Sequence, residues 1–397
     1  MTIHLKIGIT IIVSLGFVLL IGWTSVTNQG PQPSWQGKIV TDKNIRVVNN
    51  PAEPLFGELI LQLEQDLSIG GNENDDNYYF PKGVRGLSVD DEGNIYVTDG
   101  GNRRIQKYDK TGKYVQTIGR GGQGPGEYQS PSRILFDEEG SLCVYDSPAI
   151  HFFHKDGTFI KKVVLKIFIN DPVITTGRFV YGITPASFRP GGPKESIAKM
   201  DLEGTLAQTV AEFQVEYDVN RNIIAWHGYS NHLSLSPISL KSFCYGYSAE
   251  YKIYLADSEG KTILIMTKDE KPKSITSEEK AAIRKVGPWG GYLRSGNQNL
   301  EEGIVFPPQR PYFTLLRTDG AGRIYVERRK SILDKSSEML YDIFCTDGYY
   351  LYKMQLGFRP IFMKAGFIYE VRENKETGDV KIIRYKIKNW EQIKVGI

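Results

Sequence analysis

Residues 90–99 read DDEGNIYVTD, and the same pattern returns at residues 137–146, DEEGSLCVYD, and at residues 318–327, TDGAGRIYVE. Each copy is an acidic turn that ends in glycine and leads into alternating apolar residues. Asp and Asn tolerate the left-handed backbone of a tight turn, and Gly supplies positive φ without steric cost. Each copy therefore predicts two short strands joined by a tight turn.

A second pattern of the same kind follows each of these hairpins. It occupies residues 105–115, 150–160 and 341–351, and residues 197–206 repeat it more loosely. Two hairpins make one unit of four short antiparallel strands. A unit of about 45 residues has the length of a propeller blade, so the repeat predicts an all-β propeller.

Six such units fit the chain, which predicts a six-bladed β-propeller of four-stranded antiparallel blades. After the first two, the units are expected at residues 173–183 with 196–210, 242–257 with 262–274, 312–355, and 361–371 with 380–387. Two stretches do not repeat, residues 214–237 and 277–308. Long insertions between blades usually lie on one face, and residues 277–284 suggest a short helix with Ser277 near its N-cap.

The two ends of the propeller are expected to meet in one blade. Residues 58–69 read as a strand that ends in Ile-Gly, as the outer strand at residues 114–119 does. We expect residues 58–69 to supply the fourth strand of the last blade, which removes an open edge. The domain plan is then a leader over residues 1–30, a linker over 31–56 and the propeller over 57–397.

The first two units resemble NHL-type six-bladed β-propellers. That repeat has a glycine-rich link, a proline before the inner strand, an Asp-x-x-Gly turn and an Asn-x-Arg-Ile element. The matching residues here are Gly124–Tyr128, Pro131, Asp137–Gly140 and Asn102–Ile105. The whole chain resembles the exported bacterial proteins known as six-bladed β-propellers. This resemblance implies a fold and a compartment, and it implies no activity.

The glycine-rich stretch at residues 118–134, IGRGGQGPGEYQSPSRI, could be mistaken for a phosphate-binding loop. Such a loop must open a helix whose first N–H groups face the anion. Pro125, Gly126 and Pro131 exclude a helix here, and another strand follows. We interpret the stretch as a link between two blades.

The amino terminus predicts export. Lys6 precedes a run, Ile7–Trp23, that has no charged residue, and no basic residue follows it until Lys38. The positive-inside rule places the amino terminus in the cytoplasm and the rest of the chain outside. A signal peptide and a retained membrane anchor both fit this segment, so membrane attachment depends on whether it is cleaved.

Composition argues against several kinds of site. A net charge of +3 with both signs scattered gives no basic stripe for nucleic acid. The five histidines are too few and too scattered for a metal centre, and no spacing of Ser, His and Asp suggests a triad. We expect no cofactor, no metal and a monomer. Each of the three cysteines lies in an apolar run and is expected to be a buried thiol, and these are Cys143, Cys244 and Cys345.

Arginines recur just before or at the start of the inner strands. They are Arg85, Arg133, Arg310 and Arg359, and Arg189 is a fifth example. Inner strands line a propeller's central channel, so these guanidinium groups could ring one mouth and bind carboxylate, sulfate or phosphate. Alternatively, each arginine pairs with a neighbouring blade and only holds the ring together.

The sequence favours an extracytoplasmic binding or scaffolding propeller without evident catalysis. Its ligand would be a protein, a peptide or a glycan. Aromatic residues over 226–247 could contact such a partner, or they could pack between blades. A propeller lyase or hydrolase with a site in the channel is the alternative, and a purely structural envelope component is a third.

Overall fold

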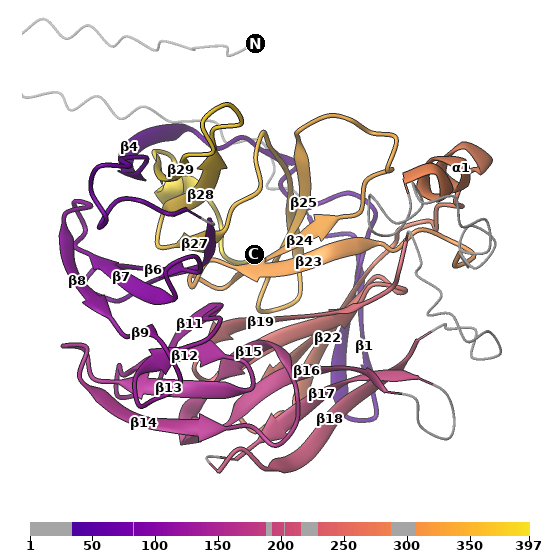
Figure 1. Cartoon of the computed structure of the whole chain (residues 1–397). Coiled ribbons are helices and arrows are strands. Elements are labelled where there is room, and N and C mark those ends of the chain that lie inside the picture. The colour runs from indigo at the N-terminus through magenta and orange to yellow at the C-terminus, as the bar shows by residue number, and fades with distance from the viewer. Residues whose placement is uncertain (1–33, 82, 188–192, 202, 216–228, 287–305) are drawn as a thin grey trace, which may run out of the picture. The chain divides into compact units, whose positions relative to one another are not determined.

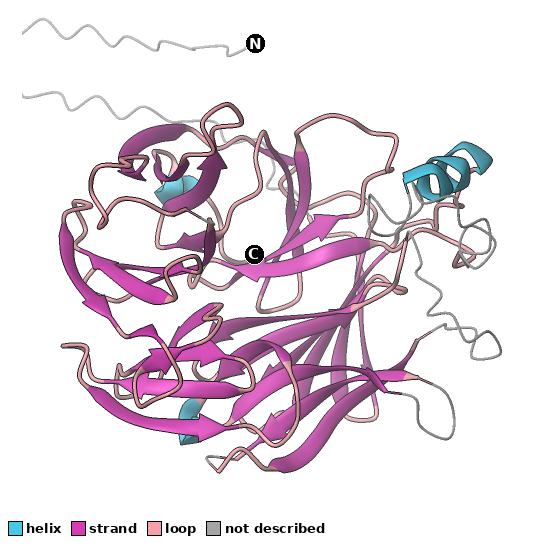
Figure 2. Cartoon of the chain, viewed as in Figure 1, coloured by secondary structure: helices cyan, strands magenta, loops and turns pink. Residues whose placement is uncertain are grey.

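The computed structural model describes residues 34–81, 83–187, 193–201, 203–215, 229–286 and 306–397. The chain divides into Met1–Ser34 and Trp35–Ile397, and the propeller lies entirely in the second unit. The blades follow one another around a central axis (Figure 1), and nearly all regular structure is strand (Figure 2). The predicted six-bladed β-propeller is confirmed, with four antiparallel strands as the basis of each blade.

The first three blades are four-stranded sheets in which each strand pairs with the next along the chain. Their strands, from the channel outward, are β5 (Val84–Val89), β6 (Ile95–Asp99), β7 (Arg104–Tyr108) and β8 (Tyr114–Ile118); β11 (Arg133–Phe136), β12 (Leu142–Asp146), β13 (Ala149–Phe153) and β14 (Phe159–Val164); and β15 (Asn170–Ile174), β16 (Val180–Ser187), β17 (Lys194–Met200) and β18 (Leu206–Gln214). The glycine-rich link between the first two blades contains only the short pair β9 (Arg120–Gly121) and β10 (Glu127–Tyr128).

The last three blades follow the same plan but recruit strands from the start of the domain. Their own strands are β19 (Leu233–Ser239), β20 (Ser242–Tyr247), β21 (Lys252–Asp257) and β22 (Thr262–Lys268); β23 (Phe313–Thr318), β24 (Arg323–Arg328), β25 (Met339–Cys345) and β26 (Tyr350–Leu356); and β27 (Phe362–Lys364), β28 (Phe367–Glu373) and β29 (Val380–Ile387). Strand β19 lies largely within residues 214–237, where the repeat was not recognised. Its apolar residues alternate with serine, which hides the usual inner-strand pattern.

In the repeated acidic turn, the first carboxylate accepts hydrogen bonds from the backbone of the turn. Asp90 accepts hydrogen bonds from the backbone N–H groups of Glu92 at 3.0 Å and Asn94 at 2.8 Å, while Gly93 has φ 88°. Asp137 holds its turn in the same way, through the N–H of Ser141 at 2.7 Å. The side chain replaces backbone partners that a tight turn cannot provide. The Asp-x-x-Gly signature therefore marks tight hairpins, and it also closes outer hairpins, such as the turn at Asp109.

An amino-terminal arm, residues 35–70, runs along the outside of three blades. Strand β1 (Lys38–Asp42) pairs with β2 (Ile45–Asn50), and β2 adds parallel to β22 of the fourth blade. Strand β3 (Glu58–Leu59) adds parallel to β26 of the fifth blade. Strand β4 (Leu63–Gly70) pairs antiparallel with β29 and is the fourth strand of the sixth blade.

The arm differs from the linker expected over residues 31–56. Asn50 explains why this segment is ordered. Its side chain is 3 % exposed and donates to the carbonyls of Thr267 at 3.0 Å and Gly348 at 2.8 Å. It accepts from the N–H of Tyr350 at 2.7 Å and from the indole of Trp35 at 3.1 Å. One amide therefore fastens the arm to both the fourth and the fifth blade.

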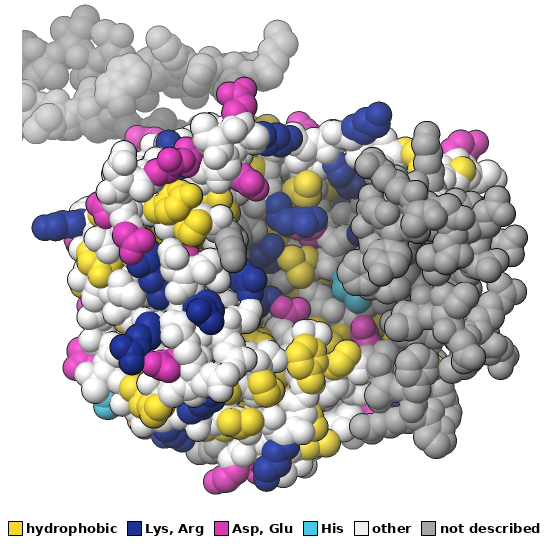
Figure 3. All heavy atoms as spheres, viewed as in Figure 1, with side chains coloured by type: hydrophobic (Ala, Val, Ile, Leu, Met, Phe, Trp, Pro, Cys, Tyr) yellow, Lys and Arg dark blue, Asp and Glu magenta, His cyan; other side chains and the backbone are white. Residues whose placement is uncertain are grey.

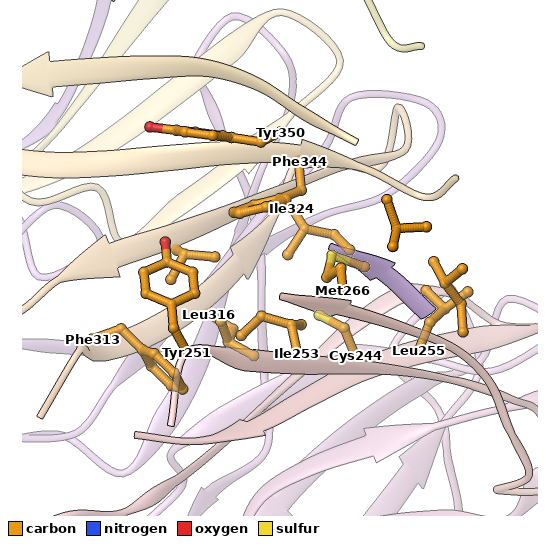
Figure 4. Close-up of a cluster of buried hydrophobic side chains, with 13 residues drawn as sticks. Cys244, Tyr251, Ile253, Leu255, Met266, Phe313, Leu316, Ile324, Phe344 and Tyr350 are labelled. Atoms are coloured by element: carbon orange, nitrogen blue, oxygen red, sulfur yellow. The ribbon is translucent and has the colours of Figure 1, made fainter. Parts of the chain in front are cut away.

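Apolar side chains fill the gaps between neighbouring blades. Figure 4 shows the cluster between the fourth and fifth blades, where Cys244, Ile253 and Met266 face Phe313, Ile324 and Phe344. All three cysteines are free and buried, as predicted. Tyr245 and Tyr247, from the aromatic stretch over residues 226–247, also pack in a core cluster with strands of the third blade. The part of this stretch before residue 229 lies outside the described residues.

The described part of the second insertion contains helix α1 (Ser277–Val286). Thr276 is its N-cap, one residue before the expected Ser277, because its hydroxyl accepts from the N–H of Glu279 at 3.2 Å. Glu279 accepts in return from the N–H of Thr276 at 2.9 Å and from the Tyr229 hydroxyl at 2.6 Å. No helix within the described ranges is long and apolar enough to cross a membrane, and Ile7–Trp23 lies outside them.

Candidate functional site

The central channel contains a cavity of about 790 Å³. Side chains from the inner strands of all six blades line it, so the ring as a whole creates the space. Figure 3 shows this face hollowed at its centre, with Lys and Arg side chains gathered along one wall of the hollow. We refer to the end where the six inner strands begin as the amino-terminal mouth.

Two of the four predicted arginines, Arg85 and Arg133, line the cavity at this mouth. Arg85 donates to the hydroxyl of Ser130 on the approach to the second blade. Arg133 forms an ion pair with Asp171 of the third blade. Both side chains therefore line the channel and also join one blade to the next.

The other two arginines are not among the residues that line the cavity. The Nε of Arg310 lies 3.5 Å from Oε1 of Glu279, so this side chain holds helix α1. The Nη2 of Arg359 lies 2.6 Å from Oε1 of Glu327, which is 2 % exposed. The fifth arginine, Arg189, lies outside the described residues.

Arg317 also lines the channel, and it was not among the arginines predicted from the sequence. Its Nη1 donates to the carbonyl of Ile361 at 3.2 Å, so the guanidinium reaches the start of the sixth blade. Its buried Nε has no hydrogen-bond partner, and no carboxylate of the described residues pairs with it. Burial lowers the pKa of Arg317. The pKa is raised by Tyr341 and Glu327, and it is lowered further by the positive charges of Arg133 and Arg359.

A carboxyl group and an imidazole lie in the same cavity, where the third and fourth blades meet. Glu195 of β17 accepts the backbone N–H of Leu233 at 2.8 Å, and burial raises its pKa. The ring of His232 contacts two carbonyl oxygens, through Nδ1 to Ser230 at 3.2 Å and through Nε2 to Thr314 at 2.6 Å. These two contacts fix the orientation of the ring.

The charges of the lining are unequal. Four cationic side chains face two carboxylates, and these residues are Arg85, Arg133, Arg317, Lys364, Asp171 and Glu195. Lys364 is satisfied at the other end of the channel, where it donates to the carbonyl of Val89 and to Asp91, both at 2.9 Å. Within the described ranges, no group of three or more His, Cys, Asp or Glu side chains could hold a metal ion. The lining of the cavity therefore carries more positive than negative charge.

Comparisons with known proteins agree with this architecture. A family model described as 6-bladed beta-propeller matches residues 82–178. The chain is similar to a crystal structure of a protein described as exported, from Bacteroides fragilis, with 12% identity and a TM-score of 0.51, covering 85% of this chain and 100% of that one. It is also similar to a member of the DUF4221 family from Bacteroides vulgatus, with 11% identity and a TM-score of 0.52, covering 83% and 99%. No curated protein matches the chain. At these identities the likeness concerns the fold.

Proposed function

We propose that the protein is an exported, monomeric binding propeller that holds an anionic group of its ligand in the central channel. The ligand is a protein, a peptide or a glycan outside the cytoplasm. The amino-terminal run Ile7–Trp23 supports export, as does the likeness to a Bacteroides fragilis protein that is described as exported. An envelope location also agrees with the resemblance to exported six-bladed propellers.

This proposal rests on the hydrogen-bond and ion-pair partners that Arg317 lacks among the described residues. Arg85, Arg133 and Lys364 each have a polar partner on a neighbouring blade, and such contacts alone would explain their presence. The guanidinium of Arg317 donates a hydrogen bond to a single carbonyl, and its Nε is buried without a hydrogen-bond partner in the described part of the chain. The positive charges of Arg133 and Arg359 lower its pKa. A partly buried cation without an ion-pair partner is costly, and a bound carboxylate, sulfate or phosphate would offset that cost.

The binding test uses a matched pair of arginine variants. Arg317→Gln removes the unpaired charge, whereas Arg120→Gln removes a solvent-exposed arginine of the first interblade link, whose side chain is 82 % exposed. We expect Arg317→Gln to weaken binding of an anionic ligand roughly 10- to 100-fold, the effect of one charge-assisted hydrogen bond. Calorimetric titration with anionic and neutral oligosaccharides and peptides measures this. Equal affinities of both variants would refute the proposal.

A lyase or hydrolase that works in the same channel is the second candidate. Glu195 favours it, because burial raises the pKa of this carboxyl, which is the direction that a general acid needs. The discriminating measurement is turnover of a bound ligand. Cleavage that is abolished in Glu195→Gln, with binding retained, would select the enzyme.

A further inference from the structure

The cavity of the central channel has two unlike regions. Charged groups gather at the amino-terminal mouth, where Arg85, Arg133, Glu195 and His232 lie at or just before inner strands or reach over them. Farther along the channel the lining is mainly apolar, apart from Arg317 near the end of β23 and Lys364 at the end of β27. Several apolar side chains of the lining remain partly exposed. Leu315 belongs to no core cluster, whereas the others pack against the edges of clusters, and these are Leu135, Phe136, Ile238, Ile361 and Phe362.

Leu315 is the most informative of these side chains. It is only half-buried, it lines the cavity, and it belongs to none of the interblade core clusters. It stands two residues before Arg317 on β23, so the two side chains point to the same face of the strand. An apolar surface of this kind therefore lies directly beside the unpaired guanidinium.

The apolar region offers little to a polar ligand. Each inner strand is the first strand of its sheet, so one of its edges pairs with the second strand and the other faces the channel. Side chains already occupy several groups of these free edges: the N–H of Leu316 donates to Ser234, and the carbonyls of Thr314 and Pro237 contact His232 and Thr318. Sugar hydroxyls or peptide amides that entered this region would give up water and find few free partners, and each group left unpaired costs about 1–3 kcal/mol. Hydrocarbon, in contrast, gains from every apolar contact. A volume of about 790 Å³ is in the range of pockets for small ligands.

We propose that the channel binds a small amphiphilic carboxylate, namely an alkyl or aryl acid. Its carboxylate lies at Arg317 and Arg133, and its hydrocarbon body lies along Leu315, Leu135 and Phe136. This proposal rests on the anion-binding part of the proposed function, since it uses the same cation for the anionic head, and it replaces the protein, peptide or glycan by a small acid. It goes further by naming the chemistry of the body that the head carries.

The experiment titrates the purified full chain with straight-chain carboxylates from hexanoate to decanoate, kept below their micelle concentrations. We expect affinity to rise about fourfold for each added methylene until the cavity is filled. Primary alcohols of the same lengths should bind at least tenfold more weakly, because they lack the charge. Trigalacturonate and an acidic, apolar tripeptide serve as competing ligand classes.

Two variants and one control locate the effect in the channel. Leu315→Asn should reduce the increase of affinity with chain length, and Arg317→Gln should remove the preference for carboxylate over alcohol. The matched control is Leu206→Asn, since Leu206 is 43% exposed on an outer strand. It should bind all probes as the unchanged protein does, and a loss confined to the two channel variants excludes binding at the amino-terminal apolar run.

The outcomes separate the two proposals. Binding of trigalacturonate or the peptide, but not of the alkyl carboxylates, would overturn the amphiphile and leave the anion-binding function standing. An affinity that is independent of chain length would overturn it as well. Equal binding of alcohols and carboxylates, or binding of no probe, would refute both proposals.

Discussion

Replacing Asn50 by alanine should separate the amino-terminal arm from the fourth and fifth blades. The change removes four hydrogen bonds of 2.7–3.1 Å, to Thr267, Gly348, Tyr350 and Trp35. A typical bond contributes about 1 kcal/mol net, and the buried groups left without partners cost more. We therefore expect the free energy of unfolding to fall by about 4 kcal/mol, which is large for a single substitution.

The assay is equilibrium unfolding in urea, followed by tyrosine and tryptophan fluorescence. Asn74→Ala is the matched control, because Asn74 lies exposed in a turn and its side-chain amide makes no hydrogen bond given by the described structure. It should change stability by less than about 0.5 kcal/mol. If Asn50→Ala were as mild as this control, the arm would not be fastened as described, and the reasoning from its contacts would fail.

Three further predictions concern titration and thiol access. Burial raises the pKa of Glu195 above its ordinary 4.5, so affinity for an anionic probe should increase as the pH falls through that pKa and the repelling charge disappears; Glu195→Gln should show the tighter binding already at pH 7. Burial also lowers the pKa of His151 below 6.5, so the free energy of unfolding should decrease as the pH falls below about 6.5. His151→Phe should remove this decrease, and its free energy of unfolding at pH 5.5 should exceed that of the unchanged protein by at least about 1 kcal/mol, measured by unfolding at several pH values. A water-soluble thiol reagent should react with no cysteine of the native protein and with all three after denaturation, and early reaction of any one would contradict their burial.

The sequence predicted best what local turn chemistry determines. The turns that begin at Asp90, Asp137 and Asp319 place a carboxylate and a glycine at fixed spacing, so the first, second and fifth blades were visible from residue types alone. The helix at residues 277–286 was also expected, since its capping residues are neighbours in sequence. Each of these signals is complete within about ten residues.

Features that depend on distant partners were not predictable in the same way. Strand β2 follows a short turn at Lys43 and Asn44 that contains no glycine, and its other edge pairs with β22, more than 200 residues away, which the local sequence does not reveal. For the site, two of the four predicted arginines, Arg85 and Arg133, line the cavity, and Arg310 and Arg359 are not among its lining residues. Arg317 lies within a strand whose register shifts between Phe313 and Leu315, so the face it occupies could not be derived from alternation.

The amino-terminal arm has a consequence for the order in which this protein can fold. Residues 38–70 are synthesised first, yet their partners lie in the last three blades, with sequence separations of 300 residues between Asn50 and Tyr350 and 318 between Asp66 and Arg384. The ring therefore cannot be completed while the chain is emerging, and its closure must wait for the carboxyl terminus. A chain that stays open until its last strand arrives is well suited to crossing a membrane before it folds.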